Sequence, residues 1–146
     1  TIMVVVASSP EQKQLAAQIL QKEIGVQPSA DLQAIFWVNK ETGVIEWVTG
    51  YTGFLGKTCQ MHFWSAGTGY TPKEFIRFAF EYPFNQAGRD LIFGVCNSLN
   101  TKAMKYDHKV GMKEVMSFPG MHDDGGDMVI FQMAKEDCRW IKEKHQ

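Results

Sequence analysis

Strand-like and helix-like spacing of apolar residues alternate along the first half of the chain. Ser9, Pro10 and Gln12 occupy the N-cap, first and third positions of a helix start, and apolar residues at helical spacing follow as far as Gly25. We therefore expect an amphipathic helix over 10–24. Runs of β-branched or alternating residues bounded by turn residues predict strands over 2–7, 34–38, 44–49 and 58–64.

The period of the apolar pattern changes in the second half. A glycine-containing loop over 65–70 precedes Thr71-Pro72-Lys73-Glu74, which has the form of a capping box with proline at the first helical position. Aromatic residues at helical spacing follow, and we expect Pro83 to end or kink this helix and Gly88 to close the segment. The other elements predicted in this half are a strand over 91–96, a helix over 101–110 that ends at Gly111, and strands over 114–118 and 128–133.

These elements form the order β-α-β-β-β-α-β-α-β-β. No repeat or linker-like stretch interrupts them, so we expect one α/β domain over 1–146. The helical connection between the strands at 58–64 and 91–96 is long enough to make these two strands parallel. The predicted sheet is therefore mixed, with helices on both of its faces.

Composition limits what such a domain can do. The 146 residues carry a formal net charge of −1, and 45% of them are hydrophobic, as in soluble globular proteins. Neither nucleic acid nor an anionic membrane is an expected partner, because the chain has no basic excess. No apolar run approaches the ~20 residues that span a bilayer, and the run at 2–7 is too short for a secretory signal. Cys59, Cys96 and Cys138 are odd in number and form no CxxC pair, which favours a reducing compartment, the cytoplasm.

One cluster contains residue types that bind metals. His122 stands close to Asp123, Asp124 and Asp127 in a glycine-containing stretch. Their spacing matches no established ligand pattern, and a turn between the last two strands accounts for them better. We expect no metal site.

The segment 100–112 carries a family resemblance. Asn100 and Ala103, followed by Lys109-Val110-Gly111-Met112, resemble the pattern of the GNAT N-acetyltransferase superfamily, in which Asn, Ala three residues later, and Lys-Leu-Gly-Phe bound one helix. The runs CQMHFW, EFIRFAFEYPFNQAG and GDMVIFQMAKEDCRW are similar to small GNAT-like proteins encoded by bacteriophages and prophages. The resemblance extends roughly over 38–140, about two-thirds of the chain. It implies a mostly antiparallel mixed sheet in which a central pair of parallel strands splays apart.

The resemblance also implies a place for coenzyme A. Its pantetheine arm would lie between the strands at 58–64 and 91–96, and its pyrophosphate at the loop before the next helix, where backbone N–H groups attract anions and glycines let the phosphate approach. Trp64 stands where the family motif has Gln or Arg, and no basic residue occurs in this loop before Lys73. The expected coenzyme contacts are Phe63, Trp64, Gly67, Thr68, Gly69, Tyr70, Thr71, Asn97 and Asn100.

The catalytic residues that the resemblance implies depart from the family. Asp107 stands where GNAT enzymes often carry a tyrosine that protonates the coenzyme A thiolate, and Tyr106 precedes it. Asp107 could donate a proton only if burial raised its pKa, since an ordinary aspartate is ionised at neutral pH. A small rotation of the helix would bring Tyr106 to the thiolate instead, and both side chains could also be purely structural. Candidates for the general base are Glu46, His62 and His108, of which His62 is best placed beside the expected cleft.

Two functions remain open at this point. The first is an acetyl-CoA-dependent N-acetyltransferase that acts on a small amine or a host protein, with Tyr106, Asp107 and His62 as catalytic candidates. The second is a non-catalytic GNAT-like phage structural or host-interaction protein, in the bacterial cytoplasm or in the virion, which the missing tyrosine and Trp64 favour. Phe54, Tyr70 and Trp140 are expected to be exposed aromatics suited to a homodimer interface.

Overall fold

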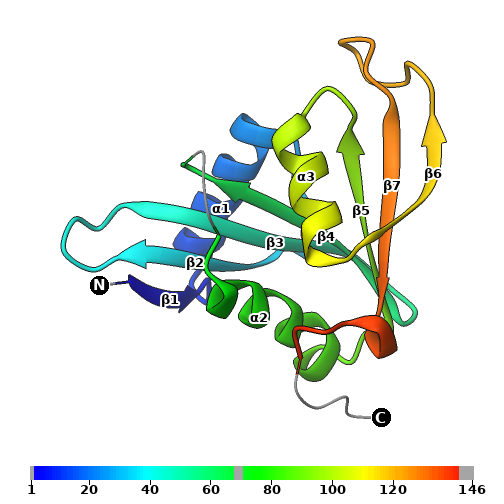
Figure 1. The fold of residues 1–146 in the computed structure, drawn as a ribbon. Coiled ribbons are helices and arrows are strands. Elements are labelled where there is room, and N and C mark those ends of the chain that lie inside the picture. Colours follow the sequence, from blue (N-terminus) through cyan, green and yellow to red (C-terminus); the bar gives the residue numbers. More distant parts are fainter. Residues whose placement is uncertain (1, 68–70, 142–146) are drawn as a thin grey trace.

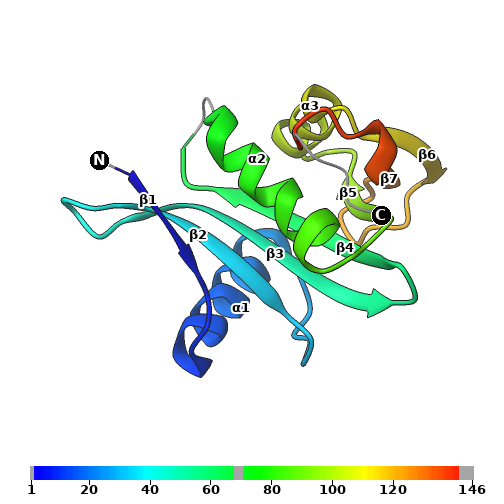
Figure 2. The same ribbon diagram turned by 90° about the horizontal axis from the view of Figure 1, so that it is seen from below.

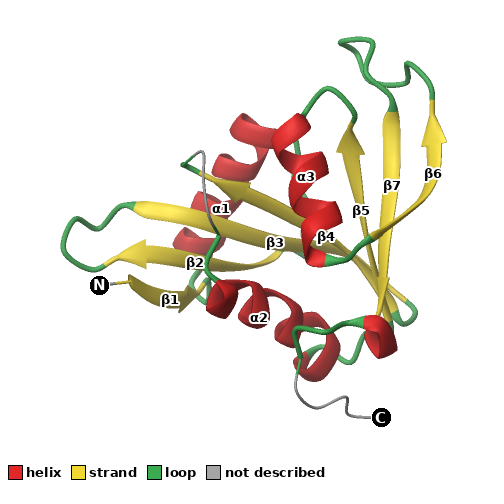
Figure 3. Ribbon diagram, viewed as in Figure 1, coloured by secondary structure: helices red, strands yellow, loops and turns green. Residues whose placement is uncertain are grey.

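The computed structural model describes residues 2–67 and 71–141. Within them, the elements follow the predicted order (Figures 1 and 3). They are β1 (Ile2–Val6), α1 (Pro10–Ile24), β2 (Gln33–Asn39), β3 (Ile45–Leu55), β4 (Thr58–Ser65), α2 (Lys73–Glu81), the π-helical turn η1 (Tyr82–Gln86), β5 (Leu91–Asn97), α3 (Thr101–Val110), β6 (Lys113–Phe118), β7 (Met128–Ala134) and the 3₁₀ turn η2 (Lys135–Asp137).

The strands form one seven-stranded sheet in the order β1-β2-β3-β4-β5-β7-β6. Every neighbouring pair is antiparallel except β4 and β5, which are parallel. Helix α1 covers one face of the sheet, and α2 and α3 lie on the other (Figure 2). The prediction of a mixed, mostly antiparallel sheet with helices on both faces is confirmed.

The two central strands separate after a short stretch of pairing. Their register is limited to Thr58–Leu91, Cys59–Ile92 and Gln60–Phe93, although both strands continue beyond these residues. The two halves of the sheet consequently diverge, and α3 lies in front of the opening (Figure 1). Gly94 follows the last pair, and a Cβ atom there would lie 3.3 Å from the carbonyl oxygen of Met61. A side chain at position 94 would therefore crowd the β4 backbone at the point from which the strands diverge.

Each face of the sheet has its own apolar core. On the α1 side, Leu20 is fully buried against Val48 and Leu32. On the other side, Phe75 and Phe80 of α2 lie in a larger cluster that contains residues of both halves of the sheet. Side chains along β4 alternate between these cores as predicted, so that Cys59, Met61 and Phe63 pack into the larger one and Trp64 into the smaller.

The helix starts were predicted with unequal success. At α1 the capping box is present: the Gln12 backbone N–H donates to Ser9 Oγ at 3.1 Å, and the Ser9 N–H donates to Gln12 Oε1 at 3.0 Å. At α2 the predicted capping box is wrong. Pro72 is extended, with φ −60° and ψ 136°, and occupies the N-cap itself, where no side chain accepts a hydrogen bond. Helix α2 thus begins one residue later than the pattern required, and Thr71 stands outside it.

Of the two outcomes expected at Pro83, the end of the α-helix is observed, because α2 ends at Glu81. Pro83 lies in η1, directly after the α-helical part, and the Ala87 N–H donates to the Tyr82 carbonyl at 2.8 Å across the wider turn. Gly88, with φ +67°, closes the segment as expected, because a left-handed backbone conformation favours glycine.

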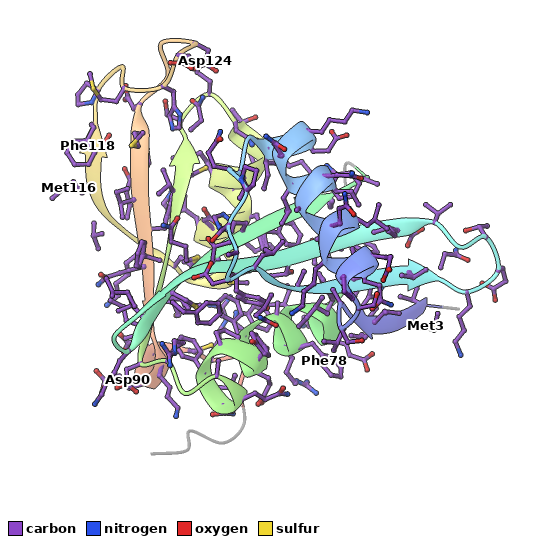
Figure 4. All side chains as sticks on the ribbon, turned by 180° about the vertical axis from the view of Figure 1, so that it is seen from behind. Met3, Phe78, Asp90, Met116, Phe118 and Asp124 are labelled. Atoms are coloured by element: carbon purple, nitrogen blue, oxygen red, sulfur yellow. The ribbon has the colours of Figure 1, made fainter. Side chains whose placement is uncertain are left out.

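The expectation for the exposed aromatics is wrong for the two that the structure describes. Phe54 is half-buried beneath the Arg89 guanidinium, 5.7 Å from its ring centre, and the Trp140 Nε1–H donates to the Val110 carbonyl at 2.8 Å. Tyr70 lies outside the described residues. Exposed apolar side chains gather instead on the edge strand β6, among them Met116 and Phe118, which point away from the sheet (Figure 4).

Two further expectations from the composition concern membrane-spanning segments and the state of the cysteines. None of the described helices is long and apolar enough to cross a membrane. Cys59, Cys96 and Cys138 are all buried thiols without a disulfide. Among the described residues, no group of three or more His, Cys, Asp or Glu side chains is placed to hold a metal ion.

Candidate functional site

The opening between β4 and β5 leads into a cleft under α3. Its larger part, here the outer pocket, has a volume of about 580 Å³. It is lined by the end of β4, by Thr71 and Ile76 around the start of α2, by α3, and by Glu23 and Ile24 at the end of α1. Lining residues used below are Phe63, Trp64, Ser65, Thr71, Asn100 and Tyr106.

A smaller inner pocket of about 200 Å³ continues the cleft between the diverging strands. Phe63, Asn100 and Tyr106 line both pockets, so the two are adjoining parts of one cleft. The inner pocket adds His62 from β4, the stretch 94–97 of β5, Asp107 from α3 and His122 from the β6–β7 loop. Together with Ile24 and Val26 at the end of α1 and Phe80 of α2, residues from six separate segments of the chain meet here.

Lysines from α3 line the outer pocket. Lys102, Lys105 and Lys109 are exposed on the turns of the helix that face it. The Lys102 ammonium group donates to the carbonyl oxygens of Ser65, at 3.0 Å, and of Gly67. A cation thus reaches the loop after β4, although the loop's own sequence supplies none. Their i, i+3, i+7 spacing puts them on one helix face, a pattern that in the sequence alone is interpreted as solvated surface and not as part of a site.

The residues expected at the pyrophosphate lie at this same end of the cleft. Trp64 and Thr71 line the outer pocket, and Gly67 is exposed with no atom within 4 Å of where its Cβ would be. Thr68, Gly69 and Tyr70 lie outside the described residues. Anions are favoured here by the positive end of α2 together with the lysines of α3.

Asn97 and Asn100 line the cleft but also hold the backbone around it. The Asn100 side-chain oxygen caps α3 by accepting from the Ala103 N–H at 3.1 Å. The Asn97 amide group donates to both carboxylate oxygens of Asp124 at 3.0 Å, and its oxygen accepts from the Leu99 N–H. These side chains fix the start of α3 relative to β5 and the β6–β7 loop.

Asp107 and Tyr106 occupy neighbouring positions on the cleft side of α3. Burial raises the pKa of the Asp107 carboxyl from its ordinary 3.8 to about 7. The Tyr106 ring stacks on Phe63, with ring centres 3.9 Å apart, and its hydroxyl is buried without a hydrogen-bond partner among the described residues. Burial, and then the nearby Asp107 charge, raise the pKa of Tyr106. Asp107 is thus the more acidic of the two proton donors.

The three candidates for the general base are separated by the fold. His62 lines the inner pocket with its Nε2 2.7 Å from Thr52 Oγ1, and burial lowers its pKa from 6.5 to about 4, so it is neutral at pH 7. His108 is exposed on the other side of α3, 3.7 Å from the Glu114 carboxylate, and neither it nor Glu46 lines the described cleft. His122, which the sequence assigned to a turn, lines the inner pocket.

Comparison with known proteins was made by sequence and by structure. No protein-family model and no curated protein matches the chain. A spermidine/spermine N-acetyltransferase from Vibrio cholerae is similar in structure, with a TM-score of 0.71 over 92% of this chain and 94% of that chain at 8% identity. The chain has the GNAT fold. The Vibrio cholerae spermidine N-acetyltransferase in complex with CoA and spermine gives a TM-score of 0.70 over 93% and 96% of the two chains at 10% identity.

A GNAT-family acetyltransferase from Bacillus anthracis is a more distant match in shape. It gives a TM-score of 0.59 over 70% of this chain and 66% of that chain, at 16% identity. The structural similarity establishes the common fold, whereas at these identities the chemistry of the cleft has to be argued from this chain's own residues.

Proposed function

We propose that the chain is an acetyl-CoA-dependent N-acetyltransferase that acts on an amine. The observation that carries the proposal is the separation of β4 and β5 after Gln60–Phe93, which opens a cleft under α3 with Asp107 at its inner end. A parallel pair that stops in mid-strand leaves backbone N–H and C=O groups without a strand partner, and an extended amide-containing arm can pair with them. Similar structures include N-acetyltransferases, one of them in complex with CoA and spermine.

The cleft has a charge distribution that suits coenzyme A. Lys102, Lys105 and Lys109 give its outer part a positive wall opposite the N-terminus of α2, where phosphate groups would be held. The pantetheine arm would run from there along β4 beside Phe63. The thioester would then lie in the inner pocket, near Asp107 and His62.

The reaction needs a proton donor at the leaving thiolate. The amine nitrogen attacks the thioester carbon, the C–S bond breaks, and the sulfur takes up a proton. Asp107 can supply it, because a carboxyl group with a pKa of about 7 is largely protonated just below neutral pH. Tyr106 is the second candidate donor. His62 is proposed to orient the acceptor rather than to act as a strong base, since burial lowers its pKa to about 4.

Binding of acetyl-CoA is the first test. Thermal denaturation should show a stabilisation of about 2.7 kcal/mol when acetyl-CoA is present at a hundredfold excess over its Kd. Absence of any shift at millimolar acetyl-CoA would exclude the coenzyme and favour the non-catalytic alternative, a phage structural or host-interaction protein.

Transfer is the second test. We expect acetyl transfer to spermine or to a lysine-containing peptide to fall on the order of a hundredfold in Asp107→Asn, and to be less affected in Tyr106→Phe. The reverse order would assign proton donation to Tyr106. A small amine and a host protein are both open as acceptors, and this pair of probes distinguishes them.

Partner and location rest on the sequence alone. The resemblance to phage and prophage proteins, a cytoplasmic or virion location, a phage or host protein partner and a homodimer stay predictions. If a homodimer forms, the exposed apolar side chains of β6, among them Met116 and Phe118, are better suited to its interface than the half-buried Phe54 and Trp140.

A further inference from the structure

The β6–β7 loop is tied firmly to the end of β5. The Asn97 amide donates to the Asp124 carboxylate at 3.0 Å, and Ser98 and Asp127 exchange two hydrogen bonds, from Ser98 N–H to the Asp127 carbonyl at 3.0 Å and from Asp127 N–H to Ser98 Oγ at 2.8 Å. In Figure 1 this loop lies at the end of the sheet where β5 ends and α3 begins. The loop therefore has a fixed position beside the inner pocket.

Hydrogen bonds inside the loop fix the backbone of His122. Its N–H donates to the Gly126 carbonyl at 3.1 Å, and its own carbonyl accepts from the Gly125 N–H at 2.9 Å. A Cβ atom on Gly126 would lie 1.9 Å from Asn97 Oδ1, so only glycine permits this approach between the loop and β5.

The Nε2 atom of the His122 imidazole is unpaired within the described residues. The imidazole lines the inner pocket together with Asp107 and Asn97, and its Nε2 atom is buried. A buried polar atom without a hydrogen-bond partner destabilises the folded protein, so a tightly built loop that holds one at a pocket wall has a ligand as the natural partner. The titratable groups around it are Asp107, Tyr106, His62 and the Cys96 thiol in the same pocket and Asp124 in the loop.

We propose that His122 is a catalytic base that takes the proton lost by the acceptor amine, a role that rests on the proposed function. The amine nitrogen forms a bond to the thioester carbon, and its proton passes to His122 Nε2. When the C–S bond breaks, the electron pair goes to sulfur, which takes a proton from Asp107. His122 ends protonated and Asp107 ionised, and return of one proton from His122 to Asp107 through solvent restores both groups.

His122 suits this role better than His62. The His62 Nε2 already lies 2.7 Å from Thr52 Oγ1, whereas the His122 Nε2 is unpaired. His122 also enters the pocket from the β6–β7 loop, so it faces α3 and its Asp107 from a different segment. Base and acid thereby come from two separate walls of one cleft.

The test is acetyl transfer from acetyl-CoA to spermine and to a lysine-containing peptide, with the Kd of acetyl-CoA measured in parallel. We expect His122→Gln to lower kcat about a hundredfold or more with the Kd of acetyl-CoA unchanged, since general base catalysis contributes on the order of 10²–10⁴-fold. Asp123→Asn changes an exposed neighbour in the same loop that lines neither pocket and should keep the wild-type rate.

Two further variants separate chemistry from structure. His122→Ala should regain rate when free imidazole is added, which a merely structural histidine would not show. Gly126→Val keeps His122 but forces the loop away from Asn97, and should lose rate to a similar extent. A wild-type chain inert towards both amines would overturn the proposed function and this inference with it, whereas an active wild type with an equally active His122→Gln would overturn this inference alone.

Discussion

At the scale of single residues, Asp107 shows how burial changes the chemistry of a carboxyl group. Its pKa in the folded protein, about 7, lies above the ordinary 3.8, so folding favours the protonated form. This stabilisation is complete below about pH 4 and is lost as the pH rises through about 7, because the ionised form is penalised in the folded state. Above that pH the cost is on the order of 4 kcal/mol.

Asp107→Asn should remove this pH dependence, because asparagine does not ionise. We expect the variant to gain stability relative to the wild type as the pH rises from about 4 to about 8. Urea unfolding at several pH values measures the difference. Asp90→Asn is the matched control, because Asp90 is exposed and only 3.7 Å from the equally exposed Lys57 ammonium. A difference between Asp107→Asn and the wild type that stays constant with pH would contradict the assigned pKa.

Substitution of Lys102 tests where the phosphate groups of coenzyme A bind in the cleft. Lys102→Met removes the cation that reaches the loop after β4, and the Kd of coenzyme A should rise about tenfold, the value of one charge-assisted contact. Isothermal titration calorimetry at low and high salt would measure it, and the loss should shrink at high salt. Lys57→Met, at the other end of β4, should bind as the wild type does. Equal affinities of the two variants would contradict this placement of the phosphates.

Sequence analysis identified Asp107 as the residue that departs from the family but could not assign its state. Its pKa depends on how deeply α3 sits against the inner pocket, which is a property of the packed molecule. His122 was missed for a similar reason. Local sequence assigns it correctly to a turn, but only the hydrogen bonds of Asn97 and Ser98 to that turn bring it to the pocket. Lys102 reaches the loop from a distant segment of the chain in the same way.

At the scale of elements, the sequence pattern predicted an element best where the residues that stabilise it lie close together in the chain. The start of α1 was predicted because both partners of its capping box, Ser9 and Gln12, lie within four consecutive residues. Strand β3 extends to Leu55, well beyond the predicted end at 49, because pairing with β2 and β4 continues through Gly50. A Cβ atom at Gly50 would lie 2.5 Å from Leu20 Cδ1, so this glycine reflects close packing of α1 and not a turn.

The capping box gives an element-scale prediction. Ser9→Ala removes the acceptor for the Gln12 N–H and should lower the free energy of unfolding by about 1 kcal/mol. Ser8→Ala is the matched control. Its hydroxyl lies 3.3 Å from Gln12 Oε1 in an exposed setting and does not cap the helix. Chemical denaturation of both variants measures the two losses, and equal losses would show that the box itself contributes nothing.

At the scale of the whole molecule, the order of elements was enough to predict a mixed sheet with β4 and β5 parallel, because a long helical connection joins them. It did not predict the rest of the strand order: β1 and β2 are antiparallel although α1 connects them, and β7 lies between β5 and β6. The point where the two strands separate, after Gln60–Phe93, was not predictable, because both strands continue beyond it and no turn residue marks it in β4. The cleft is therefore a property of the assembled fold.

The divergence of the strands raises the question of whether the two halves of the sheet unfold together. Direct pairing between them is confined to three residue pairs of β4 and β5. The larger core nevertheless contains Trp37 of β2 and Phe131 of β7, with Phe80 of α2 fully buried in the same cluster. Apolar packing beneath α2 thus connects the halves where hydrogen bonds do not, and we expect one cooperative transition.

Phe80→Ala tests whether the two halves of the sheet unfold together. Deleting a fully buried phenylalanine costs about 3–5 kcal/mol, and the loss should appear equally in both halves because they share the cavity that it leaves. Pulsed hydrogen exchange along a urea series, followed by mass spectrometry of peptides from β2–β3 and from β5–β7, would give a midpoint for each half. Phe78→Ala, on the exposed side of the same helix, is the control and should shift neither midpoint by much (Figure 4). Separate midpoints, with only the β2–β3 peptides responding to Phe80→Ala, would show that the cleft divides the molecule into two independently folding halves.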